Sequence, residues 1–248
     1  MASCIASALR SSVALLLAAG ACAQEARDPA ADRIKILEHT LRDYGGLIRY
    51  GSDNSELPPA KQNETRVIFF GDQITDFWGR KAGQFFTGKA WLNRGIAGQT
   101  TDQMLIRFRQ DAIALNPKAV VILGGLNDIA GLHGASTEEM ILDNLISMTE
   151  LARAHGIRVV LASLTPVCNC DGRSAVRERW RERIAEANEL IEKYCAASGA
   201  AYLDYYSAMS HDGDLKKELT SDGVLPNEAG YAVMARLAEK SIAEALLK

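Results

Sequence analysis

The 248-residue sequence has little excess charge of either sign. Lysine and arginine contribute 28 residues and aspartate and glutamate 31, so the formal net charge at pH 7 is -3. A protein that binds nucleic acid through bulk charge needs an excess of basic residues, and this composition excludes that class of partner. No internal repeat or low-complexity tract interrupts the sequence, and one globular core of ordinary size accounts for its length.

The sequence also lacks a hydrophobic run long enough for a transmembrane helix. The apolar run Val13–Ala19 is much shorter than the roughly 20 residues that span a bilayer. Arg10 precedes this run and Ala21-Cys22-Ala23 follows it, which is the pattern of a secretory signal. We therefore predict a signal peptide over residues 1–23 and a mature protein that is secreted or periplasmic. The alternative is that Cys22 is lipidated and anchors a lipoprotein.

Cysteines are few. Of the five in the chain, Cys168, Cys170 and Cys195 remain after the predicted signal peptide. An odd number gives no disulfide framework, and one thiol stays unpaired unless it pairs between chains. The Cys-x-Cys at residues 168–170 lacks the second pair, or the spaced histidines, of a zinc site. We predict no metal and no cofactor.

A regular alternation of apolar runs and amphipathic stretches begins at residue 66. The expected strands are 67–70, 90–93, 119–123, 158–163 and 201–203. Stretches with apolar residues at helical spacing separate them, and this order is typical of a three-layer α/β/α sandwich with a five-stranded parallel sheet. We assign residues 66–248 to this domain. Residues 24–65 are expected to form a helix near 32–43 and a polar connecting arm.

Four polar, glycine-containing segments follow the expected strands or precede the last helix. Gly71-Asp72-Gln73 follows the first strand directly, at the strand end where open α/β sheets bind ligands. The other three are Asn93-Arg94-Gly95-Ile96-Ala97-Gly98, Gly125-Leu126-Asn127-Asp128 and Asp222-Gly223-Val224-Leu225-Pro226-Asn227. In order and spacing these segments resemble the sequence blocks of the GDSL or SGNH hydrolases, which are serine esterases and lipases. The resemblance covers about residues 65–248 and implies a flavodoxin-like SGNH hydrolase fold.

The resemblance also implies a role for each segment. Asp222 would be the acid that orients the catalytic base, and the oxyanion donors would be the amides of Gln73 and Gly95 and the side chain of Asn127. Two departures stand out: Gln73 occupies the nucleophile position, and Leu225 occupies the position of the histidine base. A carboxamide is a poor nucleophile and a leucine side chain cannot carry a proton, so the serine mechanism is expected to be lost.

The leading hypothesis is an exported protein of this fold that binds a small acyl or ester ligand without hydrolysing it. The carbonyl of Gln73 would accept hydrogen bonds from Gly95 and Asn127 and so occupy the oxyanion hole. Asp222 would then be an acid without its imidazole partner, or a turn residue before Gly223.

Two alternatives stay open. The first is an active carboxylic-ester hydrolase of the lysophospholipase or carbohydrate acetyl esterase type. Its nucleophile would be Cys168 or Cys170, with His133 as base, or a water molecule held by Asp222. The second is a structural or interaction protein whose pocket is filled by its own side chains.

Overall fold

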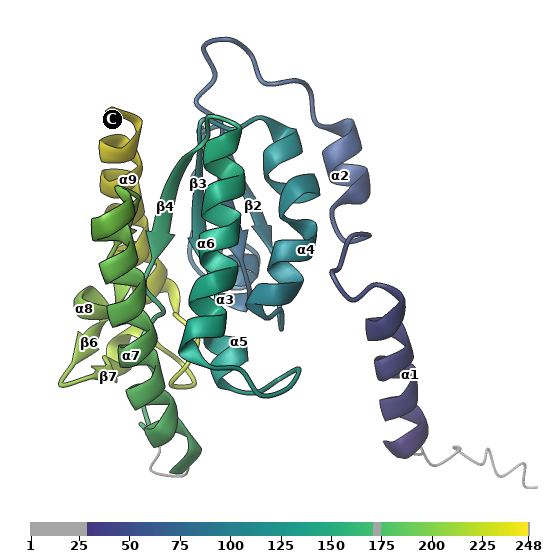
Figure 1. Ribbon diagram of the computed structural model, residues 1–248. Coiled ribbons are helices and arrows are strands. Elements are labelled where there is room, and N and C mark those ends of the chain that lie inside the picture. The colour runs from purple at the N-terminus through teal and green to yellow at the C-terminus, as the bar shows by residue number, and fades with distance from the viewer. Residues whose placement is uncertain (1–28, 171–174, 248) are drawn as a thin grey trace, which may run out of the picture. The chain divides into compact units, whose positions relative to one another are not determined.

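The chain is described by a computed structural model that covers residues 29–170 and 175–247 (Figure 1). The predicted signal peptide and Cys22 lie outside the described residues. Helix α1 (Pro29–Arg42) is present where the sequence predicts a helix near 32–43. The chain divides into two compact units at residue 40, and the second unit contains the sheet. None of the described helices is both long and apolar enough to cross a membrane.

Parallel strands in the order β2-β1-β3-β4-β5 form the central sheet. Their bounds are β1 (Val67–Gly71), β2 (Trp91–Gly95), β3 (Ala119–Leu123), β4 (Arg158–Ala162) and β5 (Ala201–Leu203). The predicted α/β class and the five-stranded parallel sheet are confirmed. Strands β1 and β3 are buried along their whole length, which explains why both are continuous apolar runs rather than alternating patterns.

Helices cover both faces of this sheet (Figure 1). On one face α4 (Thr101–Asp111), α6 (Glu138–Ala154) and α7 (Ala175–Ser198) pack side by side. On the other face lie α3 (Gln73–Phe77) and α9 (Glu228–Leu247). Successive residues of β1 point to opposite faces, so Phe70 contacts Phe108 of α4 while Phe69 contacts Trp78 at the end of α3.

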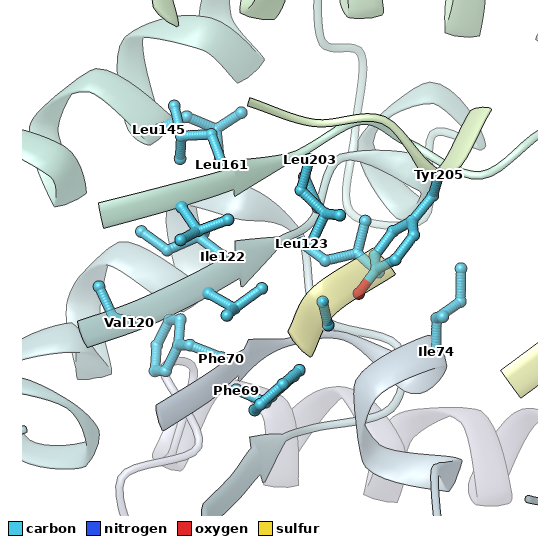
Figure 2. Close-up of a cluster of buried hydrophobic side chains, with 14 of the residues drawn as sticks. Phe69, Phe70, Ile74, Val120, Ile122, Leu123, Leu145, Leu161, Leu203 and Tyr205 are labelled. Atoms are coloured by element: carbon cyan, nitrogen blue, oxygen red, sulfur yellow. The ribbon is translucent and has the colours of Figure 1, made fainter. Parts of the chain in front are cut away.

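Short elements complete the chain. They are η1 (Ile113–Leu115), α5 (Leu126–Ile129), α8 (Tyr205–Met209), β6 (Ser210–His211), β7 (Asp214–Leu215) and η2 (Lys217–Leu219). Strands β6 and β7 pair as an antiparallel hairpin. Buried apolar side chains from the sheet and both helical layers form one continuous cluster, and Figure 2 shows part of it, including Ile74 of α3, Leu145 of α6 and Leu161 of β4.

The segment before β1 is more structured than the polar arm that the sequence predicts. It contains the short helix α2 (Gly51–Glu56). The buried side chain of Tyr50 donates its hydroxyl to the carbonyl of Gly95 at 2.5 Å. Asn54 of α2 donates to Asp111 at 2.7 Å and accepts from Nε of Arg94 at 2.9 Å. Polar contacts with α4 and β2 therefore hold this segment against the domain.

Candidate functional site

The carboxyl ends of three neighbouring strands define one corner of the sheet. Gly71 at the end of β1 is paired with Gly95 of β2 on one side and with Leu123 of β3 on the other. The loops that leave these strands lead to α3, α4 and α5, and α3 and α5 lie at the same end of the sheet in Figure 1. Three of the four segments singled out from the sequence therefore meet at this corner.

The turn from β1 into α3 positions Gln73. Asp72 caps the helix, and its Oδ1 accepts a hydrogen bond from the amide of Ile74 at 2.9 Å. A Cβ on Gly71 would lie 2.4 Å from the carbonyl oxygen of Leu123 and 2.4 Å from Oγ1 of Thr75, so no larger residue fits there. Gln73 thus becomes the first residue of α3, and its side chain is half-buried.

The carboxamides of Gln73 and Asn127 pair with each other. Nδ2 of Asn127 donates to Oε1 of Gln73 at 2.7 Å, and Nε2 of Gln73 donates back to Oδ1 of Asn127 at 3.1 Å. The backbone amide of Gly98 donates to the same Oε1 at 3.1 Å. One side-chain carbonyl therefore receives two N–H donors, which is the arrangement that an oxyanion hole offers to a substrate.

Backbone groups fix the orientation of both carboxamides. Nδ2 of Asn127 also donates to the carbonyl of Gln99 at 2.7 Å, so the amino group of Asn127 must face that carbonyl. The amide of Gly98 can only donate, so an oxygen of Gln73 must face it. The direction of each hydrogen bond in the pair follows from these two constraints.

The glycine that completes this donor set is Gly98 and not Gly95. The amide of Gly95 donates to Oδ1 of Asn93 at 2.9 Å, and its carbonyl accepts from Tyr50. A Cβ on Gly95 would lie 2.1 Å from the amide nitrogen of Asp76, so close packing of β2 against α3 requires glycine here. The expected bond from Gly95 to Gln73 is therefore wrong. The sequence does contain Gly98, which adopts a φ of +84° that favours glycine.

A fully buried arginine, which sequence reasoning missed, ties the corner together. Arg107 of α4 donates from Nη2 to the carbonyl of Gly71 at 2.9 Å and from Nη1 to the carbonyl of Arg94 at 2.9 Å. Its Nε donates to Oε1 of Gln99 at 2.5 Å, and Asp111 balances its charge at 3.2 Å. Burial lowers the pKa of Arg107 to about 10. The only sequence signal for this contact is the spacing of Arg107 and Asp111, four residues apart on one helix.

Two buried carboxyl groups flank the site. Burial raises the pKa of Asp72 to about 7, and its Oδ2 has no hydrogen-bond partner among the described residues. Burial also raises the pKa of Asp128. Asp128 accepts from the amide of Thr101 at 3.0 Å and from its hydroxyl at 2.7 Å, so it connects the Asn127 loop to the first turn of α4.

The segment 222–225 forms a self-contained turn. Oδ1 of the exposed Asp222 accepts from the amides of Val224 at 2.9 Å and Leu225 at 2.7 Å. Thr220 donates its hydroxyl to the carbonyl of Leu225 at 2.7 Å. The Leu225 side chain is partly buried against the apolar cluster. Asp222 therefore makes the contacts of a turn residue.

Helix α9 connects this turn to α3. Tyr231 donates its hydroxyl to the carbonyl of Ile74 at 2.8 Å, and its ring stacks on Trp78 with centroids 5.2 Å apart. The start of α9, and the turn that precedes it, therefore lie at the same end of the sheet as Gln73. Within the described residues, however, no hydrogen bond joins the Gln73–Asn127 pair to the Asp222 turn.

The cysteines of the alternative nucleophile form a disulfide with each other. Cys168 and Cys170 are linked, and buried Cys195 is free. A disulfide sulfur has no thiolate to attack an ester, so the expectation of a Cys168 or Cys170 nucleophile does not fit this state of the protein. The sequence argument used only the odd number of cysteines. It did not predict this pairing, because three cysteines can still form one disulfide between near neighbours.

His133 is exposed and lies apart from the disulfide loop. It borders a small cavity of about 150 Å³ that is also lined by Thr100, Asp102 and Asp128. Its ring meets Tyr44 edge-on, with centroids 6.3 Å apart. The cavity lining contains neither cysteine of the loop, so the structure does not bring a Cys–His pair together.

Comparison with known proteins identifies the family of this domain. The sequence model of the GDSL-like Lipase/Acylhydrolase family matches residues 68–233, which is more than half of the chain. The chain belongs to this family. The match contains Gln73, Gly98, Asn127 and Leu225, so the corner described above lies inside the GDSL-like domain.

Individual relatives agree with this assignment. The crystal structure of a GDSL-like lipase from Bacteroides thetaiotaomicron is 36% identical, covers 82% of this chain and 99% of its own, and superposes with a TM-score of 0.76. An isoamyl acetate-hydrolyzing esterase 1 homolog of Rattus norvegicus is 28% identical over 64% of this chain and 74% of that protein. The lipoprotein YqeF of Bacillus subtilis is 34% identical over 85 residues, so this chain spans about a third of that lipoprotein.

In this GDSL-like domain two N–H donors at the corner of the sheet converge on one side-chain carbonyl. The side chain of Asn127 and the amide of Gly98 form the donor set, and the carboxamide of Gln73 supplies the acceptor. The site also shows no group of His, Cys, Asp or Glu residues, within the part of the chain that the structure describes, that could hold a metal ion.

Proposed function

We propose that this GDSL-family protein is exported, does not hydrolyse esters by the serine route, and binds a small acyl or ester ligand at the Gln73 corner. One observation carries this proposal. The side-chain carbonyl of Gln73 accepts hydrogen bonds from Asn127 at 2.7 Å and Gly98 at 3.1 Å, which is how an ester carbonyl would be held during acyl transfer.

Gln73 acts in this proposal as an internal stand-in for the ligand. An amide carbonyl and an ester carbonyl are both acceptors of two hydrogen bonds, so one can replace the other without leaving a donor unpaired. The side chain of Gln73 is half-buried and begins a helix, so rotation about its side-chain bonds can release the donors to an incoming carbonyl. Ligand affinity would then measure the competition between the two carbonyls.

The absence of serine chemistry follows from the groups available to react. The carboxamide of Gln73 has no ionisable proton, and Leu225 cannot receive one. Asp222 directs its carboxylate to the amides of its own turn. Similarity to the lipoprotein YqeF, together with the signal-like pattern of residues 1–23, supports export.

The same contacts favour a second candidate. If Gln73 never leaves the donors, the corner is permanently filled, and the domain serves as an interaction or structural protein. This candidate predicts that no carbonyl ligand competes with Gln73 at any concentration, whereas the ligand-binding proposal predicts competition.

The decisive experiment removes the internal carbonyl. In Gln73→Ala the donors of Asn127 and Gly98 lose their partner, so affinity for ethyl butyrate, measured by NMR titration, should rise about tenfold, the value of one or two net hydrogen bonds. Gln110→Ala removes a glutamine outside the donor set, whose side chain binds the carbonyl of Leu47, and should leave affinity unchanged. No binding by the unmodified protein, with binding gained in Gln73→Ala, would support the filled-corner candidate. Equal and measurable affinity in both proteins would show that the ester does not bind at these donors and would contradict the proposal.

A further inference from the structure

A second cavity lies at the opposite end of α3 from Gln73. Its volume is about 420 Å³. It is lined by Arg49, Tyr50, Asp76, Trp78, Arg80 and Phe85, among others. Gln73, Gly98 and Asn127 do not line it, so this cavity is separate from the donor set described above.

Two guanidinium groups border the cavity. The Arg49 group lies 4.6 Å from the ring centroid of Tyr50, and its side chain forms no ion pair or hydrogen bond to the rest of the described chain. Arg80 pairs with Asp76 through Nε and Nη2, which holds the group in place and leaves Nη1 available. Together they present N–H donors that can chelate an oxyanion.

A buried arginine adds positive charge behind this surface. The guanidinium of Arg94 also lies over the Tyr50 ring, at 4.7 Å. Its hydrogen-bond partners are neutral: Oδ1 of Asn54 and the carbonyl of Asn93, both at 2.9 Å. Burial lowers the pKa of Arg94. A buried charge without a bonded counter-ion is costly, and an anion in the adjoining cavity would offset that cost.

The carboxylates nearby do not cancel this charge. Asp76 is already bound to Arg80. Asp111 forms an ion pair with Arg107 at 3.2 Å. Asp53 of α2 is exposed and attracts Arg94 only at longer range. The cavity therefore retains a net positive potential that favours a monoanion.

Aromatic side chains form part of the wall. Trp78 and Phe85 meet edge-on with centroids 5.8 Å apart, and both contact Phe69 of the sheet. The turn between them is tight: a Cβ on Gly79, which has a φ of +79°, would lie 2.6 Å from Cβ of Phe85. This wall is fixed by packing. Trp78 is only 3% exposed, so the partly exposed Phe85 offers most of the aromatic surface to a flat apolar group.

We propose that this cavity binds an organic carboxylate with a flat apolar body, whose carboxylate lies between Arg49 and Arg80 and whose body lies against Trp78 and Phe85. This site is additional to the Gln73 corner, and its occupation does not depend on the proposed function of that corner.

Calorimetric titration of the full chain with sodium benzoate at low ionic strength tests this site. Benzoate should bind with one-to-one stoichiometry, and benzamide, its neutral isostere, should bind at least about tenfold more weakly because it lacks the charge-assisted bonds. Arg49→Gln should weaken benzoate binding about tenfold for the same reason. Arg179→Gln, which removes another exposed arginine on α7, should leave it unchanged.

Three results would overturn the assignment. They are equal affinity for benzoate and benzamide, equal affinity of Arg49→Gln and Arg179→Gln, and binding of inorganic phosphate as tightly as benzoate, which would remove the role of the aromatic wall. Circular dichroism of each variant checks folding, and Arg49→Lys, which keeps the charge but loses the fork of donors, should retain intermediate affinity.

Discussion

Gln73 and Leu225 lie in two regions that satisfy their polar groups in different ways. Gln73 enters a partly buried donor set and supplies the acceptor for Asn127 and Gly98. Leu225 belongs to a surface turn whose hydrogen bonds are made by Asp222 and Thr220 within the turn itself. Donors that are shielded from water require a partner, whereas an apolar side chain on a turn requires none. The side chain at position 73 is therefore constrained by its hydrogen-bond partners, and the side chain at position 225 is constrained only by packing.

The largest expected effect comes from altering both regions together. Gln73→Ser with Leu225→His should raise hydrolysis of p-nitrophenyl acetate about 10³-fold or more over the unmodified protein, since nucleophile and base act as a unit. Either substitution alone should gain far less. Initial rates of the three variants at saturating ester give the comparison.

The control for this gain is Asn127→Ala in the doubly substituted protein, which should lower the rate by about 10²-fold because an oxyanion donor is lost. Hydrolysis by the unmodified protein as fast as by the double variant would contradict the proposed loss of the serine mechanism.

A smaller effect is expected on the pH dependence of stability, which should differ between Asp72 and Asp222. The pKa of buried Asp72 is raised to about 7, so the folded protein holds this proton more tightly than the unfolded chain. Its contribution to the free energy of unfolding is greatest below about pH 4, falls as the pH rises to about 7, and is constant above that. The total fall is at most about 4 kcal/mol, at about 1.4 kcal/mol per pH unit.

Urea unfolding between pH 4 and pH 8 measures this effect. Asp72→Asn keeps an acceptor for the amide of Ile74 and should flatten the pH dependence relative to the unmodified protein. Asp222→Asn, at an exposed position, should follow the unmodified curve. Parallel curves for Asp72→Asn and the unmodified protein would show that Asp72 does not titrate in this range.

The smallest expected effect is the difference in stability between the two polar networks. Asn127→Ala leaves the backbone carbonyl of Gln99 and the side-chain Nε2 of Gln73 without their partner. The free energy of unfolding should fall by about 2 kcal/mol. Asp222→Ala exposes two turn amides to water and should cost only about 0.5 kcal/mol. Thermal and urea unfolding at pH 7 give both values. A larger loss for Asp222→Ala would reverse the comparison between the regions.

The sheet could be predicted because strands that are buried on both faces appear in the sequence as continuous apolar runs. Strands β1 and β3 are unbroken apolar runs, and each precedes a turn of glycine and polar residues. Helix α2 has no such run: none of its residues is buried. The contacts that hold it come from Tyr50 and Asn54, whose partners lie about 40 or more residues away in the chain.

The candidate site could be predicted at the level of segments but not of individual atoms. Asn127 and Gln73 do meet as expected. Which glycine donates depends on Asn93, whose side chain takes the amide of Gly95 and leaves that of Gly98 for Gln73. Such competition between neighbouring acceptors is decided by backbone geometry, which residue spacing does not specify.

Arg107 gives this corner of the sheet a structural role in addition to any role in binding. Its guanidinium joins the ends of β1 and β2 and the loop before α4 through Gly71, Arg94 and Gln99. Loss of these contacts would leave the buried guanidinium of Arg107 without partners, which would strongly destabilise the folded state. A protein of this fold without catalytic activity would therefore keep the N–H donors of Asn127 and Gly98, because the same corner stabilises the fold. A new function could then arise by a change in the group that accepts their hydrogen bonds.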